Sequence, residues 1–339
     1  MKFRAFLFAL TFTVMLFLPM TAALGAEAPE TEPNEPNEHL TETAPAPSEQ
    51  VTVENDATAE PAALPVFRIY DETEKTVREV PALDYVAGAI AAEMGADFEP
   101  EALLAQGIAA FSCALYQKEA HEGTEYDFTA DPTEKQIYLT EEKAREVYGD
   151  SFPEKWEKIT AAAEKAVQKV VTFGGHPALT VYHALSAGWT EDAANVWKGP
   201  VPYLVAVESP GDTQSEQFLS KVTVTKARAL TLLNSSGAGL SGKEPEKWFE
   251  GMKVSPSGYV TEIPIGKATF SGTKLRGLFG LRSAAFCVTY ADDVFTFTVK
   301  GFGHGVGLSQ IGADYMAKNG ATAEEILAHY YPGTVLSDF

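Results

Sequence analysis

The chain has 339 residues, of which 22% are charged, and a formal net charge of −21. This length is sufficient for a large core in one or two domains. The acidic balance argues against binding to nucleic acid or to an anionic membrane surface, because both call for basic patches. Two cysteines, Cys113 and Cys287, are too few for a disulfide scaffold. A single bridge and two unlinked buried thiols are both compatible with the sequence.

The N-terminal segment, residues 1–26, has two basic residues and then an uncharged apolar run that ends in small residues. This pattern predicts a signal peptide, or an uncleaved membrane anchor, since a span needs roughly 20 residues. Residues 27–65 contain ten acidic residues, several prolines and no lysine or arginine. Such a composition predicts a disordered tether. We therefore expect an exported protein, tethered to the cell membrane, whose folded region is residues 66–339.

The first part of the folded region alternates between strand and helix patterns. Residues 66–81 predict a strand, a polar turn and a second strand, and apolar residues at helical spacing predict helices over 83–95 and 101–120. Residues 121–150 are rich in turn-forming residues, and we expect irregular structure there. A further helix is expected over 153–170.

The second part is richer in strand patterns. Residues 170–184 predict a β-hairpin that turns at Gly174 and Gly175, and short strands are expected to dominate 202–300. A loop with four glycines at 301–307 precedes one expected helix, and a last helix is expected over 321–333. Helical and strand-rich stretches are partly segregated, which predicts the α+β class. We expect the helical part to pack against the strand-rich part, with a binding groove between them.

Glu93 is an unusual residue for its position. It follows Val86 and Ile90 at helical spacing and so shares their apolar stripe. A carboxyl group on a buried stripe has a raised pKa, as a general acid requires near neutral pH. The alternative is a structural glutamate that caps backbone groups or pairs with a lysine or arginine.

Residues 182–199 combine aromatic, hydroxyl and charged side chains. His183 and Ser186 stand where a strand enters a loop, and the loop continues with Trp189, Thr190, Glu191, Trp197 and Lys198. Aromatic rings that stack on sugar faces, beside polar groups that bond hydroxyls, are typical of a carbohydrate site. An ordinary surface loop can have the same composition.

The glycine-rich loop at 301–307 invites a nucleotide hypothesis, which its spacing excludes. Neither Gly301 nor Gly303 begins a G-x-G-x-x-G pattern, and no Walker sequence follows. The histidines are too scattered for a metal motif, and no nucleophile elbow is present. We expect a tight backbone crossing, in which glycines admit a substrate or another strand, with His304, Ser309 and Gln310 presented before a helix.

Three segments together resemble the SpoIID/LytB family. They are VPALDYVAGAIAAEMGADFEPEALLAQGIAA, YHALSAGWTEDAANVW and GFGHGVGLSQIGADYMAKNGATAEEILAHYYPGT. The resemblance implies a peptidoglycan lytic transglycosylase that acts during engulfment of the forespore. It also implies two partners, an amidase/endopeptidase and a sporulation membrane protein. The family's catalytic glutamate lies in an E-M-P motif, which here reads Glu93-Met94-Gly95.

The implied chemistry needs one carboxylate, which protonates the leaving oxygen and then deprotonates the C6 hydroxyl of the same sugar to give a 1,6-anhydro end. On this reading Glu93 is the acid/base. The substrate-binding residues are His183, Ser186, Thr190, Lys198, His304, Ser309 and Gln310. Two rivals stay open: a non-catalytic glycan-binding activator of an amidase, and a hydrolase that uses Glu191 or Asp192 as second carboxylate.

The sequence departs from the family at several positions. Phe111 stands where the family's A-A-R-[ST]-Y motif has its arginine, so catalytic competence is open. Some members bind zinc through a histidine and two cysteines, but Thr129 and Lys135 occupy the cysteine positions here. His121 alone does not hold zinc, and we expect neither a structural metal nor a cofactor.

Overall fold

The computed structural model describes residues 63–130, 137–197 and 199–339. It contains helices and several small sheets, which confirms the α+β prediction. Within these ranges no helix combines the length and apolar character that a membrane crossing requires. The predicted signal or anchor at 1–26 lies outside the described residues, and so does the predicted tether at 27–65 except for its last three residues.

The predicted strand–turn–strand forms β1 (Val66–Asp71) and β2 (Thr76–Pro81), which pair in antiparallel register. A third strand, β3 (Phe128–Ala130), adds in parallel to β1. Thr129, one of the two positions compared with zinc ligands, lies in β3, and Lys135 lies outside the described residues. His121 follows α2 (Pro100–Ala120), and its ring nitrogen Nδ1 bonds the Gln117 carbonyl.

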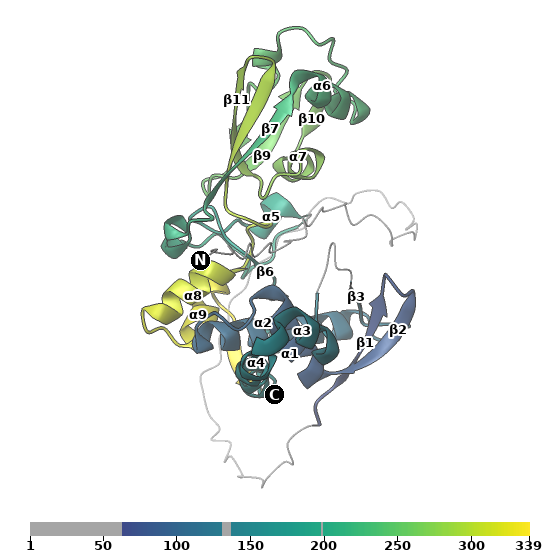
Figure 1. Cartoon of the computed structure of the whole chain (residues 1–339), viewed down its shortest axis with the longest axis vertical. Coiled ribbons are helices and arrows are strands. Elements are labelled where there is room, and N and C mark those ends of the chain that lie inside the picture. The colour runs from purple at the N-terminus through teal and green to yellow at the C-terminus, as the bar shows by residue number, and fades with distance from the viewer. Residues whose placement is uncertain (1–62, 131–136, 198) are drawn as a thin grey trace, which may run out of the picture. The chain divides into compact units, whose positions relative to one another are not determined.

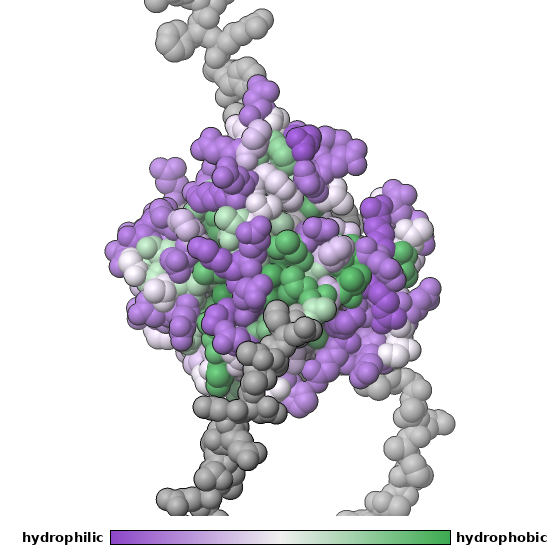
Figure 2. Space-filling view, turned by 90° about the horizontal axis from the view of Figure 1, so that it is seen from below, coloured by the Kyte–Doolittle hydropathy of each residue, from purple (hydrophilic) through white to green (hydrophobic). Residues whose placement is uncertain are grey.

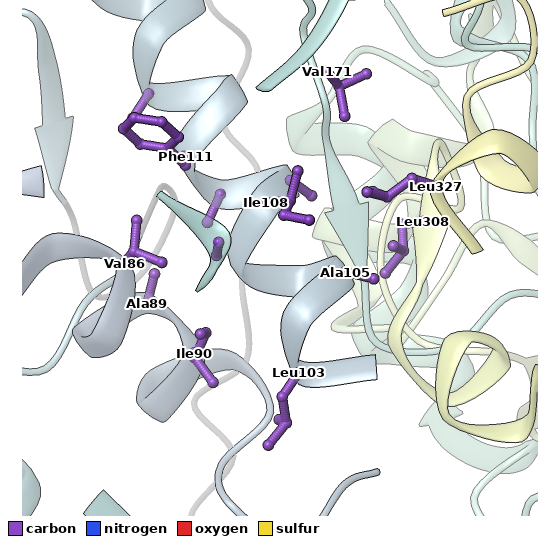
Figure 3. Packing of buried hydrophobic residues seen from close by; sticks show 14 of the residues in the cluster. Val86, Ala89, Ile90, Leu103, Ala105, Ile108, Phe111, Val171, Leu308 and Leu327 are labelled. Carbon is purple, nitrogen blue, oxygen red and sulfur yellow. The ribbon is translucent and has the colours of Figure 1, made fainter. Parts of the chain in front are cut away.

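The main core is built on α1 (Ala82–Glu93), α2 and α4 (Phe152–Ala166). Figure 3 shows Val86, Ala89 and Ile90 of α1 on the side that faces α2. Gly107 of α2 permits both neighbours to approach, because a Cβ there would lie 3.0 Å from Ile90 Cδ1 of α1 and 2.8 Å from the Ala166 Cβ of α4. The predicted apolar stripe of α1 is too narrow, because a tyrosine, a glycine and several alanines outside the stripe are also buried.

Residues 121–150 are more ordered than the sequence pattern suggested. The prediction of irregular structure was wrong for β3 and for α3 (Glu141–Tyr148) with its short 3-10 extension η1 (Gly149–Ser151). Only Ala144 of α3 is buried, so the helix lacks the apolar periodicity by which it could be found. Thr140 caps its N-terminus by accepting a hydrogen bond from Lys143 N.

The hairpin predicted over 170–184 forms only in part: β4 (Lys169–Phe173) and β5 (His176–Pro177) pair on either side of Gly174 and Gly175, but the second arm ends at Pro177. The C-terminal strand β14 (Val335–Asp338) pairs with β4, so the sheet order is β14-β4-β5. The expected C-terminal helices are α8 (Gln310–Lys318) and α9 (Ala323–Tyr330). Both contact α2, which brings the end of the chain onto the main core.

A second core lies within residues 219–300. One sheet has the order β11-β12-β7, with β11 (Ala285–Ala291), β12 (Val294–Lys300) and β7 (Leu219–Thr225). The other has the order β10-β9-β8, with β10 (Ala268–Phe270), β9 (Val260–Ile265) and β8 (Lys253–Val254). Figure 1 shows α6 and α7 beside these strands.

The strand prediction for 202–300 was therefore incomplete, because it missed α6 (Lys226–Ser235), α7 (Gly272–Phe279) and a 3-10 turn, η3 (Pro245–Lys247). The two helices carry local capping signals. Thr225 and Ser271 accept backbone hydrogen bonds at their N-termini, and Gly280 ends α7 in the left-handed conformation.

The two cysteines are unlinked, so no bridge forms between them. Cys113 is buried in α2 as expected, but Cys287 is exposed in β11.

The surface in Figure 2 is largely hydrophilic, with hydrophobic residues gathered near the centre of that face.

Candidate functional site

Glu93 is the last residue of α1. The helix ends here because Gly95 adopts a φ of 74° and its N–H bonds the Ile90 carbonyl. The side chain is only partly exposed, and burial raises the pKa of its carboxyl group to about 7. No basic residue occupies the last turn of α1. The carboxyl group therefore resembles a general acid more than an ion-paired structural glutamate.

One side chain bonds the Glu93 carboxyl group within the described residues. Gln310 Nε2 donates to Glu93 Oε2 at 3.3 Å, which opposes the rise in pKa because the bond favours the ionised form. No described residue donates to Oε1. One carboxyl oxygen is thus held by the protein, and the other is available to carry a proton.

Gln310 is brought there by a short parallel pairing. The strand β6 (Tyr182–His183) pairs with β13 (Leu308–Ser309), so that His183 stands opposite Ser309. Gln310 follows as the first residue of α8, with Ser309 as its N-cap. Two segments that are more than a hundred residues apart in the chain thereby position the partner of Glu93.

The glycine-rich loop approaches other backbone segments closely, as one of the two sequence alternatives expected. Gly301, Gly303, Gly305 and Gly307 all have positive φ. A Cβ on Gly303 would lie 2.6 Å from the His183 Cβ, and one on Gly307 would lie 2.1 Å from the Val181 carbonyl oxygen. The lack of side chains on these glycines therefore lets β6 and the residues beside it pack directly against the loop backbone.

Val306 fixes the protonation of two histidines. Its carbonyl can only accept, so His183 donates from Nδ1 at 3.1 Å. Its N–H donates to His304 Nδ1, also at 3.1 Å. Burial lowers the pKa of His183 to about 4 and lowers that of His304 well below its ordinary value. The two rings, 5.6 Å apart, are therefore neutral at physiological pH and have opposite tautomers.

Asp212, which sequence reasoning missed, organises two of the predicted residues. It lies in the 3-10 turn η2 (Pro210–Gln214) and is fully buried. Its carboxylate accepts from Ser186 N at 2.9 Å and from Ser309 Oγ at 2.8 Å. Burial raises the pKa of Asp212, and these hydrogen bonds oppose the rise. Ser186 and Ser309 are buried, so they serve first to join β6, β13 and η2.

The loop after Ser186 is held just as firmly. Thr190 is buried, and its Oγ1 accepts from Val207 N at 2.8 Å. Glu191 N donates to Gly305 O at 2.7 Å, which ties this loop to the glycine-rich loop. Trp197, after α5 (Ala193–Val196), has its ring 5.2 Å from that of His304. Lys198 lies outside the described residues.

The two carboxylates considered for a hydrolase have internal partners. Glu191 is buried, and its oxygens accept from Asp192 N, Asn195 Nδ2 and Ser255 Oγ. Asp192 caps α5 by accepting from Ala194 N at 2.8 Å. These bonds give both groups a structural role.

The predicted residues thus divide by their contacts. Gln310 contacts Glu93, His183 and His304 line the junction between β6 and the glycine-rich loop, and Ser186, Thr190 and Ser309 bond protein atoms. Glycan contact by any of them stays a prediction, as does the groove. Sequence reasoning also missed Gln106 of α2 as a site residue; its side-chain oxygen accepts from Gln310 Nε2 at 3.5 Å.

Comparisons with known proteins identify relatives of this chain. A family model described as Stage II sporulation protein matches residues 70–173. The chain is 34% identical to stage II sporulation protein D of Bacillus subtilis (strain 168), over 83% of this chain and 80% of that protein. The same protein of Bacillus amyloliquefaciens is 32% identical over 82% and 79%.

A more distant relative is the amidase enhancer of Bacillus subtilis (strain 168), 27% identical over 74% of this chain and 40% of that protein. The level of identity to the sporulation proteins, sustained over most of both chains, decides the family. This chain belongs to the SpoIID family.

Proposed function

We propose that the protein is a peptidoglycan lytic transglycosylase with Glu93 as its single acid/base. The observation that carries the proposal is the Glu93 carboxyl group, partly exposed and with a pKa raised to about 7 by burial. At pH 7 its protonated and ionised forms are present in similar amounts. One residue can therefore give up a proton in the first half of a reaction and take one back in the second.

The proposed reaction is balanced without water. Glu93 gives its proton to the glycosidic oxygen, and the bond from that oxygen to C1 of the muramic acid breaks. The C6 hydroxyl oxygen of the same sugar then bonds C1, and its proton passes to the Glu93 carboxylate. The hydrogen bond from Gln310 to Oε2 supports this cycle, since it leaves Oε1 as the oxygen that exchanges the proton.

The internal partners of Glu191 and Asp192 favour this reaction over hydrolysis. A glycosidase that activates water needs a second carboxylate in contact with the substrate or the water. Glu191 is buried and fully engaged, and Asp192 caps a helix.

The cellular role follows from the family. Relatives named as sporulation proteins support a role in remodelling the cell wall during sporulation, with peptidoglycan strands as substrate. We further propose that residues 1–26 export the chain and hold it at the membrane, that 27–65 form a tether, and that 66–339 are the catalytic domain. An amidase/endopeptidase and a sporulation membrane protein are the proposed partners.

The test is the chemistry of the product. The purified full-length protein is incubated with peptide-free glycan strands, and the ends are identified by mass spectrometry. We expect 1,6-anhydro-muramic ends, and at least a 100-fold lower rate for Glu93→Gln, because general acid–base catalysis contributes roughly 10²–10⁴-fold. Reducing ends would instead support the hydrolase, in which case Glu191→Gln is the next variant.

Glu208→Gln is the matched control, because Glu208 is exposed and uses only its backbone in the contacts described. It should retain the wild-type rate. Equal rates for wild type and Glu93→Gln would show that Glu93 is not the acid.

A second candidate function is that of a glycan-binding activator of an amidase. The relative named amidase enhancer motivates it, together with Phe111 in place of the family's arginine. Strand binding without cleavage, combined with faster turnover by an added amidase, would favour this candidate over the transglycosylase.

A further inference from the structure

Gln106 is a polar residue in an otherwise apolar part of α2. It is 0% exposed and stands between Ala105 and Gly107, which are both buried. A buried amide destabilises the folded state unless its polar atoms are bonded. Among the described residues the Gln106 Nε2 has no hydrogen-bond partner. Packing alone would thus favour an apolar side chain here, so the amide needs another explanation.

The side-chain oxygen of Gln106 supplies that explanation. Gln310 Nε2 lies 3.5 Å from Gln106 Oε1 and 3.3 Å from Glu93 Oε2. The Gln310 NH2 group thus faces two acceptors, the carboxyl group at the end of α1 and the amide oxygen on α2. Gln310 is itself only 4% exposed, so solvent does not compete strongly for its amide.

Hydrogen-bond chemistry then determines the orientation of both amides. An ionised carboxylate only accepts, so Gln310 must turn its NH2 group, not its oxygen, toward Glu93. Two NH2 groups cannot bond each other, so Gln106 must turn its oxygen toward Gln310. If Gln106 lacked this oxygen, the second Gln310 N–H would have no acceptor on α2, and the amide could rotate away.

We propose that Gln106 is a positioning residue: its side-chain oxygen holds the Gln310 amide with an N–H directed at Glu93. Gln106 does not touch the substrate, and acts only through Gln310. This proposal rests on the proposed function. It extends that function by adding Gln106 of α2 to the hydrogen bonds that connect Glu93 of α1 with Gln310 of α8.

Other titratable groups around the end of α1 are accounted for. The phenols of Tyr85 and Tyr182 sense the Glu93 charge, and their pKa values are raised, chiefly by burial, so both stay neutral. Tyr148 OH and Lys158 Nζ bond backbone carbonyls of residues 91–98, and Asp314 accepts from Glu99 N. Cys113 is a buried thiol of α2. The hydrogen bond from the Gln310 amide is therefore the contact whose change is expected to shift the pKa of the Glu93 carboxyl group.

The test measures the titration of Glu93 directly, without substrate. The full-length protein is labelled with ¹³C at glutamate carboxyl carbons, and the Glu93 signal is identified by its loss in Glu93→Gln. Its midpoint near pH 7 separates it from ordinary carboxyl groups. Removing the Gln310 bond destabilises the anion, so Gln310→Met should raise the midpoint by roughly half a unit to one unit.

Gln106→Met, which keeps the length of the side chain but lacks the oxygen, should raise the midpoint in the same direction and by no more than Gln310→Met. Gln106→Leu is a second variant of similar size. In the Gln310→Met background, Gln106→Met should cause no further shift. Gln117→Met is the matched control on the same helix, since Gln117 is eleven residues along α2, about 16 Å from Gln106.

An unchanged midpoint in both Gln106 variants would overturn the proposal, and so would additive shifts in the double variant, which would mean that Gln106 acts independently of Gln310. These outcomes leave the proposed function intact. If instead the midpoints shift as expected but wild-type protein produces no anhydro ends, the positioning role stands and the proposed function fails.

Discussion

Two regions that meet at the candidate site are built by opposite means. The end of α1 is helical and tightly surrounded, and there burial keeps the carboxyl group of Glu93 protonated up to about pH 7. The glycine-rich loop at 301–307 has little regular structure, and there positive φ angles let backbones approach within contact. The first region raises the pKa of an acid, and the second holds two neutral histidines in fixed tautomers.

The contrast extends to how each region uses its polar groups. Glu93 has one oxygen that accepts no hydrogen bond from a described residue. Around the loop, by comparison, the backbone of Val306 fixes both histidines, and Asp212 bonds two serines. In a preorganised site, hydrogen bonds are expected to fix the surrounding polar groups, while a single acid gains and loses a proton.

The largest effect should come from filling the space at Gly307. Gly307→Ala adds a Cβ 2.1 Å from the Val181 carbonyl oxygen at a φ of 70°. That oxygen also accepts a hydrogen bond from Tyr331 at 2.8 Å, so it cannot move away freely. We expect a loss of more than about 3 kcal/mol in the free energy of unfolding, measured by urea denaturation.

Gly174→Ala separates the effect of backbone strain from the effect of a steric clash with the added Cβ. Gly174 has a φ of 62° but nothing within 4 Å of the added Cβ, so only the backbone strain of about 1 kcal/mol should appear. Equal losses in the two variants would mean that close approach is not what requires glycine at position 307.

The next effect concerns the pH dependence of stability. The pKa of Glu93 is about 7 in the folded protein, above the ordinary value of 4.5. The folded state therefore binds more protons between these values, and the wild type loses stability as pH rises from about 4.5 to 7. Glu93→Gln, which cannot ionise, should match wild type at pH 5 and exceed it by about 2 kcal/mol at pH 8.

Urea denaturation at both pH values tests this, with Glu208→Gln as the exposed control. A Glu93→Gln protein that is less stable than wild type at pH 8 would contradict a desolvated acid that has no cationic partner. It would indicate a structural ion pair in place of a general acid.

The same two regions differ in how far sequence could predict them. The helices α1, α2 and α4 follow from apolar spacing, whereas α3 has one buried residue, and α6 and α7 are short helices of ten and eight residues in a strand-rich stretch. Periodicity finds long helices that bury a stripe, and it misses helices that bury little or are too short to show the repeat. Capping residues such as Thr140, Thr225 and Ser271 were the signal available for the three missed helices.

Within the site, Glu93 was found because a carboxyl group stood on an apolar stripe. Asp212 was missed because it lies in a polar turn, and its partners Ser186 and Ser309 are distant in the sequence. Gln106 did carry a signal, as the single polar residue on a face of small side chains. That signal acquires meaning only when Gln310, 204 residues away, is placed beside it.

The smallest effect should come from Phe111→Leu. This variant tests whether packing in the main core influences the pKa of Glu93. Phe111 is fully buried, and its ring lies 5.0 Å from that of Phe339 and 6.3 Å from that of Phe67. The contact with Phe67 belongs to the main core, whereas Phe339 is partly exposed at the C-terminus. Phe111 lies about 7.5 Å along α2 from Gln106. Phe111→Leu should therefore cost about 1 kcal/mol in stability and leave the Glu93 titration midpoint unchanged.

Phe111→Arg is the informative companion, because it restores the family's residue to a site that here is apolar. An unpaired buried cation is expensive, so this variant should unfold at much lower urea concentration. If Phe111→Arg instead folds and accelerates release of anhydro ends, the cation is a missing part of the site. If Phe111→Leu moves the Glu93 midpoint, the core end and the acid end of the helical region are coupled. Unchanged midpoints would show that the core around Phe111 does not influence the pKa of Glu93.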